Sequence, residues 1–79
     1  MTEKILRELN DIFVDVFDDK NIILTMETTA DDIEDWDSLE QIHLIVAIED
    51  RYGLKLSIRD VNALKDVGEM VNYIQERIT

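Results

Sequence analysis

The spacing of apolar residues in helical steps is the feature that most restricts the fold of this chain. Between residues 3 and 17 the apolar side chains recur at steps of three and four, which places them on one face of an amphipathic helix. They are Ile5, Leu6, Leu9, Ile12, Phe13, Val16 and Phe17. Further apolar runs follow residues 37 and 66, the chain contains no Pro, and neither a repeat nor a Gly/Ser linker divides it. We therefore expect an all-α fold and one domain over residues 1–79.

The stretch between residues 18 and 37 lacks the helical period and is expected to be a long loop pinned to the core. Its apolar residues are spaced so that their side chains can pack into that core. They are Ile22, Leu24, Met26 and Ile33. Thr2 is expected to cap the helix that precedes this loop.

A second helix is predicted to begin at Ser38. Asp37 and Glu40 match the reciprocal capping pattern ahead of an apolar run, with Asp in the place of the usual Ser or Thr. The run consists of Leu39, Ile42, Leu44, Ile45, Val46, Ala47 and Ile48. Because these residues cover more than one narrow stripe, we expect this helix to be the central and most buried one, ending at Tyr52 and Gly53.

Two more helices are predicted after Gly53. Ser57 is suited to cap a short helix over residues 58–63, and Asp66 with Glu69 repeats the capping pattern before the last helix. The last helix carries the apolar stripe Val67, Met70, Val71, Ile74 and Ile78. Gly68 in its first turn is expected to cost little stability. The predicted architecture is a four-helix bundle of three main antiparallel helices plus one short helix.

Composition and charge exclude several classes of protein. The 79 residues include no Cys and a single His, so neither disulfides nor a structural zinc site hold the fold, and helix packing must. The net charge of −11 argues against nucleic-acid and membrane partners and favours basic protein surfaces. The first 13 residues mix charges into the apolar positions and fit neither a signal peptide nor a membrane span, so a cytoplasmic protein is expected.

An acidic run precedes the predicted second helix. Its members are Asp31, Asp32, Glu34, Asp35 and Asp37. The run lacks the ligand order and the glycine of a calcium-binding hand loop. We therefore expect solvated charge there and no metal site.

The tripeptide Asp37-Ser38-Leu39 places a hydroxyl in the first turn of the predicted second helix, where it should be exposed. The free backbone N–H groups and the dipole at a helix N-terminus favour a phosphate joined to the serine oxygen. His43, the only histidine, lies more than one helical turn further on, so the base that a serine hydrolase needs is missing. We expect the chain not to be an enzyme.

The segment DWDSLEQIHLIVAIEDRYGLKLS, residues 35–57, resembles the core of acyl carrier proteins, and the likeness extends over nearly the whole chain to the closing stretch ALKDVGEMVNYI. The resemblance implies an acyl-carrier-protein-like fold and a free-standing carrier. It also implies that a phosphopantetheinyl transferase attaches 4′-phosphopantetheine from coenzyme A to Ser38, with Asp37 and Leu39 beside it. Acyl or related intermediates would be held as thioesters on this arm and presented to enzymes of a fatty-acid, polyketide or specialised lipid pathway.

The resemblance also assigns roles to residues along the second helix. The apolar residues implied to line a cavity for the acyl chain are Ile42, Ile45 and Val46. The acidic residues implied to dock acyl-loading and acyl-processing enzymes through basic surfaces are Glu40, Glu49 and Asp50, together with Asp37. A monomer is implied.

Three residues depart from the pattern of fatty-acid carriers. His43 stands where those carriers usually have an acid, Arg51 interrupts the acidic end of the helix, and Trp36 precedes the Asp-Ser pair. These departures favour a carrier for polyketide, lipid-modification or aminoacyl chemistry. Trp36 is expected to anchor the loop by packing, and His43 to lie at the surface. Two alternatives stay open, an aminoacyl or D-alanyl-type carrier and an unmodified acidic helical adaptor that binds a basic protein.

Overall fold

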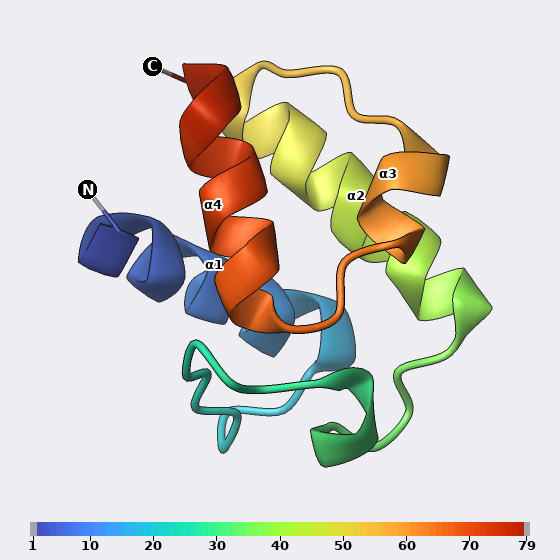
Figure 1. Cartoon of the computed structure of the whole chain (residues 1–79). Helices are drawn as coiled ribbons and strands as arrows, with labels where there is room; N and C mark the ends of the chain where they lie inside the picture. The colour runs from blue at the N-terminus through green and yellow to red at the C-terminus, as the bar shows by residue number, and fades with distance from the viewer. Residues whose placement is uncertain (1, 79) are drawn as a thin grey trace.

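The computed structural model describes residues 2–78, which form four α-helices and one short 3-10 helix. Their bounds are α1 (Thr2–Phe17), η1 (Ala30–Asp32), α2 (Ser38–Tyr52), α3 (Ile58–Asn62) and α4 (Val67–Ile78). No strand occurs among the described residues. The predicted all-helical bundle of four helices is confirmed (Figure 1).

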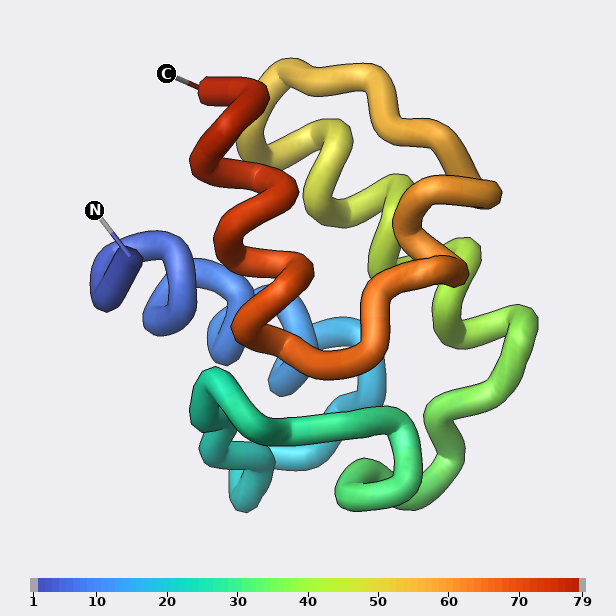
Figure 2. Tube along the Cα trace, viewed as in Figure 1, coloured from blue at the N-terminus to red at the C-terminus, as the bar shows by residue number. Residues whose placement is uncertain are grey.

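The first helix, α1, is the element that packs against both α2 and α4. Its predicted apolar face supplies four buried residues to the core, namely Ile5, Leu9, Ile12 and Phe13. The traces in Figures 1 and 2 show that α2 and α4 run in the same general direction, so the antiparallel description does not hold for this pair. The prediction that Thr2 caps α1 is wrong, because Thr2 lies inside the helix and its hydroxyl donates to Oε1 of Gln75 on α4 at 3.0 Å.

The loop between α1 and α2 is pinned to the bundle as predicted. Asn10 on α1 holds it twice, since its Nδ2 donates to the carbonyl of Ile22 at 3.1 Å and its Oδ1 accepts from the amide of Leu24 at 2.6 Å. Leu24 is 5 % exposed and belongs to the core, while Ile22, Met26 and Ile33 are partly buried against it. The loop is therefore a structural part of the domain.

The first turn of α4 is fastened to the same loop through backbone hydrogen bonds. The amides of Val67 and Gly68 donate to the carbonyls of Thr28 and Met26, each at 2.8 Å. A Cβ atom on Gly68 would lie only 2.7 Å from the Met26 carbonyl oxygen. The sequence predicted only that Gly68 costs little helix stability. The structure shows in addition that the close approach of the two backbones requires a residue without a Cβ atom.

The second helix begins at Ser38, as predicted, and ends at Gly53, whose left-handed conformation (φ 65°, ψ 35°) suits glycine. Asp37 Oδ1 accepts from the amide of Glu40 at 2.9 Å. The reciprocal half of the predicted capping pair is not formed, because the Glu40 carboxylate contacts Nδ1 of His43 at 3.1 Å instead.

The prediction that α2 is the central and most buried helix is wrong. Only Leu44, Ile45 and Ile48 are buried among its 15 residues, whereas α4 buries five residues in 12. The exposed fractions of its other large apolar residues are 60 % for Leu39, 46 % for Ile42 and 49 % for Val46. The cause is the small size of α3, whose five residues cover only part of the second apolar stripe.

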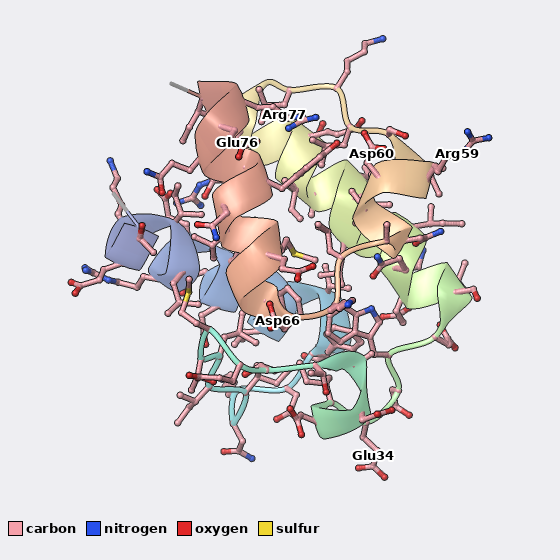
Figure 3. All side chains as sticks on the ribbon, viewed as in Figure 1. Glu34, Arg59, Asp60, Asp66, Glu76 and Arg77 are labelled. Atoms are coloured by element: carbon pink, nitrogen blue, oxygen red, sulfur yellow. The ribbon has the colours of Figure 1, made fainter. Side chains whose placement is uncertain are left out.

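The two C-terminal helices are capped as predicted. Ser57 Oγ accepts from the amide of Asp60 at 3.3 Å, and Asp66 Oδ1 accepts from the amide of Glu69 at 2.9 Å. The short helix α3 buries only Val61. Figure 3 shows Arg77 near the end of α4 turned toward Asp60 on α3, and their charged groups lie 4.0 Å apart.

Candidate functional site

Ser38 is the first residue of α2, and its side chain is exposed. The preceding residue, Asp37, has an extended backbone, and its carboxylate satisfies the Glu40 amide. Within residues 2–78 the amides of Ser38 and Leu39 donate no hydrogen bond. A helix N-terminus with unpaired amides carries partial positive charge, so an anion joined to Ser38 Oγ is electrostatically favoured.

A pocket of about 480 Å³ opens beside Ser38. Its walls come from α2, α3, the loop before α2 and the start of α4, which Asp66 marks in Figure 3. The apolar part consists of Ala30, Trp36, Ile42, Ile58, Val61, Leu64 and Met70. The polar and charged residues of the lining are Asp37, Ser38, Gln41, Asn62, Lys65 and Asp66. An apolar space with a few polar groups is typical of a small-molecule binding site.

Trp36 packs into the side of this site, as the sequence predicted for a loop anchor. Its ring meets the rings of Phe13 and Phe17 edge-on, with centroid distances of 5.1 and 6.2 Å. Its Nε1 donates to Oε1 of Gln41 at 2.7 Å. The indole therefore ties the loop before Ser38 to both α1 and α2.

The three apolar cavity candidates occupy different environments. Ile42 lines the pocket, Ile45 is 4 % exposed within the core, and Val46 is 49 % exposed and lies outside the pocket lining. Sequence reasoning did not single out Gln41 and Asn62. The position of Gln41, three residues after Ser38 and so on the same helix face, was the available signal.

The acidic candidates along α2 are also engaged differently. Asp50 is exposed, Glu40 contacts His43, and Glu49 Oε2 accepts from the amide of Leu56 at 2.8 Å. The Glu49 carboxylate thus stabilises the loop after α2. His43 lies at the surface as expected, with 54 % of its side chain exposed.

Arg51, which interrupts the acidic end of α2, is bound to the neighbouring helix. Its Nη2 lies 3.2 Å from Glu8 Oε2, and the Tyr52 hydroxyl donates to Glu8 Oε1 at 2.8 Å. The hydrogen bond from Tyr52 lowers the pKa of the Glu8 carboxyl, with Arg51 adding to the effect and burial opposing it. Burial, together with Glu8, raises the pKa of the Tyr52 phenol. Arg51 and Tyr52 therefore form a clasp between α1 and the end of α2.

The acidic run ahead of α2 points into solvent, since all five of its members are exposed. Within residues 2–78 no three His, Cys, Asp or Glu side chains are grouped so as to hold a metal ion. None of the helices in the described part of the chain has both the length and the apolar character needed to cross a membrane.

Comparisons with known proteins agree with this geometry. The family described as phosphopantetheine attachment site matches residues 7–74. An acyl carrier protein of Rhodococcus erythropolis is 35 % identical over 94 % of this chain and 81 % of its own length. A meromycolate extension acyl carrier protein of Mycobacterium leprae is 34 % identical over 94 % of this chain and 64 % of its own length.

A solved structure shows the same arrangement of helices. The solution structure of a holo acyl carrier protein from Geobacter metallireducens superposes with a TM-score of 0.83 and 42 % sequence identity, covering 90 % of this chain and 82 % of that one. With its helical bundle and phosphopantetheine-site match, the chain belongs to the acyl carrier protein family, whose members carry acyl intermediates on a covalently attached phosphopantetheine.

Proposed function

We propose that Ser38 Oγ is the atom that receives the phosphopantetheine arm. The observation that carries the proposal is an exposed hydroxyl at the N-terminus of α2, beside unpaired backbone amides and a largely apolar pocket. Ser57, the only other serine, stands just before α3 as its N-cap. Its hydroxyl, however, accepts from the Asp60 amide and does not line the pocket.

The attachment requires little chemistry from this chain. Ser38 Oγ forms a bond to the phosphorus that carries the pantetheine of coenzyme A, the bond from this phosphorus to the bridging pyrophosphate oxygen breaks, and 3′,5′-ADP leaves. The hydroxyl proton passes to a base of the transferase, because the single imidazole of this chain, His43, lies more than one helical turn away from Ser38. Asp37 fixes the first turn of α2 by accepting from the Glu40 amide. The amides of Ser38 and Leu39, which have no acceptor within residues 2–78, are available to the new phosphodiester. The bound arm supplies a terminal thiol, which holds the acyl group as a thioester.

Intact mass after incubation with coenzyme A and a phosphopantetheinyl transferase tests this assignment. We expect the wild type to gain one phosphopantetheine, Ser38→Ala to gain none, and Ser57→Ala to be loaded like the wild type. Thermal unfolding of Ser38→Ala should match the wild type within about 0.5 kcal/mol, since an exposed residue is replaced. A wild type that gains no mass would favour an unmodified acidic adaptor, and a loaded Ser38→Ala would move the site elsewhere.

The proposed partners are a phosphopantetheinyl transferase and acyl-loading and acyl-processing enzymes with basic docking surfaces. Asp37, Glu40 and Asp50 support this proposal because Asp37 caps α2 next to Ser38 and the other two lie on that helix. Glu49 remains in the proposed docking set, although its carboxylate is also bonded within the chain. A monomeric state, a single domain over residues 1–79, a cytoplasmic location and the lack of enzymatic activity are further parts of the proposal.

The proposed cargo is an acyl intermediate of a lipid pathway. The printed name of the Mycobacterium leprae relative refers to meromycolate extension, and that of the Rhodococcus erythropolis relative to an acyl carrier without further specification. The largely apolar pocket beside Ser38 supports a carbon chain as cargo. Ile42 is its proposed lining residue on α2, and Ile45 and Val46 would take part only if the helices moved.

A further inference from the structure

The orientation of the Gln41 side chain is fixed by Trp36. An indole N–H only donates, so the group that meets it at 2.7 Å is the Gln41 oxygen. The Gln41 amide nitrogen is thereby directed toward α3, where it donates to Oδ1 of Asn62 at 3.4 Å. Trp36, Gln41 and Asn62 thus form a hydrogen-bonded row from the loop before α2 to α3.

This row leaves hydrogen-bond donors at the pocket. With its oxygen facing Gln41, Asn62 directs its Nδ2 elsewhere, and the described residues offer this nitrogen no acceptor. The second hydrogen of Gln41 Nε2 has no protein acceptor in this part of the chain either. Both residues line the pocket together with Ser38. The carboxylates of Asp37 and Asp66, which also line the pocket, already accept from the amides of Glu40 and Glu69. The amide groups of Gln41 and Asn62 therefore offer the pocket N–H donors without a protein acceptor in the described chain.

The bond between Gln41 and Asn62 is also long enough to be exchanged at low cost. At 3.4 Å it is weaker than the 2.7 Å bond that holds Gln41 to Trp36. Asn62 is exposed and Gln41 partly buried, so water reaches their N–H groups in the unloaded protein. A plain alkyl chain that parted the two amides would displace this water and give the N–H groups no acceptor, which is unfavourable. A carbonyl oxygen at the same place would accept from them while the attached carbon chain met Ile42, Val61 and Met70.

We infer that Gln41 and Asn62 are specificity-determining residues of this pocket, and that their amide N–H groups bind a carbonyl oxygen of the group that fills it. This inference rests on the proposed function, because Ser38 must carry the arm that brings the carbonyl near. Two sources supply the same chemistry, an amide of the arm itself and an oxygenated carbon of the cargo. Trp36 is the positioning residue, since it acts only through Gln41.

The test compares three forms of the protein, loaded from coenzyme A, hexanoyl-coenzyme A and 3-oxohexanoyl-coenzyme A. Intact mass first establishes loading, so a failure of the proposed function is recognised separately. NMR then records the side-chain amide signals of Gln41 and Asn62, and the methyl signal of Met70, which is 4 % exposed and reports filling of the pocket. The unloaded protein is the reference.

Two outcomes support the inference and distinguish the sources. If the pocket is filled in the protein loaded from coenzyme A, which carries the arm without an acyl group, and the Gln41 amide contacts the arm, the bound carbonyl belongs to the arm. If the pocket is filled strongly in the 3-oxohexanoyl form and weakly in the hexanoyl form, the bound carbonyl belongs to the cargo. Equal filling by both cargoes without filling by the bare arm would overturn the inference, as would a pocket that stays empty in all three forms.

Substitutions separate the donor role from a packing role. Gln41→Glu keeps an acceptor for Trp36 Nε1 but removes the amide donors, and the indole N–H signal verifies that the bond persists. We expect this variant and Asn62→Ala each to lower pocket filling about fivefold, the factor that corresponds to one neutral hydrogen bond. Asn72→Ala, an exposed position on α4 outside the pocket, should fill like the wild type. Unchanged filling in Gln41→Glu would contradict the inference.

Discussion

At Gly68 the chain brings two backbone segments too close together for a side chain between them. Its amide donates to the Met26 carbonyl at 2.8 Å, and the space that a Cβ would take is 2.7 Å from the same oxygen. In an ordinary helix position, replacing glycine by alanine stabilises a protein, because glycine loses more backbone entropy on folding. At Gly68 the contact with the backbone of Met26 outweighs this entropy gain, so the same replacement is expected to lower stability.

We therefore predict that Gly68→Ala destabilises the protein by about 1–3 kcal/mol, the range for forced overpacking. Urea unfolding followed by circular dichroism measures the change. Asn72→Ala, also on α4 but exposed, serves as the control and should change the free energy of unfolding by no more than about 0.5 kcal/mol. If Gly68→Ala were more stable than the wild type, the Met26 backbone would have to move away from the new Cβ without loss of stability.

Between elements, the clasp of Glu8 with Arg51 and Tyr52 joins α1 to the end of α2. Tyr52 is partly buried, and its hydroxyl lies 2.8 Å from the Glu8 carboxylate. Because these contacts favour the ionised carboxylate, the pKa of Glu8 is lower in the folded chain than its ordinary value of 4.5. The clasp therefore contributes stability above that value and loses it as the pH falls through the folded pKa.

We predict that wild-type stability falls more between pH 7 and pH 3 than that of Glu8→Gln. The amide oxygen of the variant still accepts from Tyr52 but carries no titrating charge, and the difference should be up to about 1 kcal/mol, since the clasp is near the surface. Thermal unfolding across this pH range measures it. Tyr52→Phe should bring the pKa of Glu8 closer to its ordinary value in an NMR titration. If the stability of the wild type and that of Glu8→Gln changed equally with pH, ionisation of Glu8 would not contribute to stability.

The elements also show how far the sequence predicts the fold. The helical period located α1, and the Asp37 and Ser57 caps located the starts of α2 and α3, because these signals are local. The period shows that a face of α2 is apolar but not which neighbour covers it, so the burial of Ile42 and Val46 was overestimated. The Gly68 contact depends on Met26, which lies in a loop about 40 residues earlier in the chain. No local sequence signal connects these two residues.

The candidate site was predictable to a similar depth. Ser38 was located at an exposed helix start, because the capping signal fixes the helix boundary. The pocket beside it brings together α2, α3 and the start of α4, which depends on packing between distant segments. Gln41 and Asn62 are 21 residues apart in the chain, and no local pattern connects them.

On the scale of the whole molecule, the excess of acidic over basic side chains is the feature that acts on a charged partner at a distance. The chain carries 19 acidic and 8 basic side chains. Arg51 does not add a free positive charge beside the proposed docking residues, because it is paired with Glu8. A basic partner is therefore attracted over a distance set by the ionic strength, about 10 Å at 0.1 M salt.

We predict that Glu40→Lys and Asp50→Lys each raise the KM of loading by the transferase, and that the effect shrinks as salt is added. Glu49 is a poorer test position, since its substitution also removes the bond to Leu56. The control is Glu76→Lys, which changes the net charge equally at an exposed position on α4 (Figure 3). Equal effects at all three positions would mean that net charge, and not the α2 surface, governs docking.

The light anchoring of α3 has an energetic consequence for the pocket. Within residues 2–78 it buries one side chain, Val61, and its polar contacts to other helices are long, with Gln41 to Asn62 at 3.4 Å and Arg77 to Asp60 at 4.0 Å. Opening such a segment requires far less free energy than unfolding the domain, because few buried contacts are lost. The volume beside Ser38 is thus bounded on one side by the least firmly held helix of the bundle, and its size can change at a free-energy cost well below that of unfolding α1 and α4.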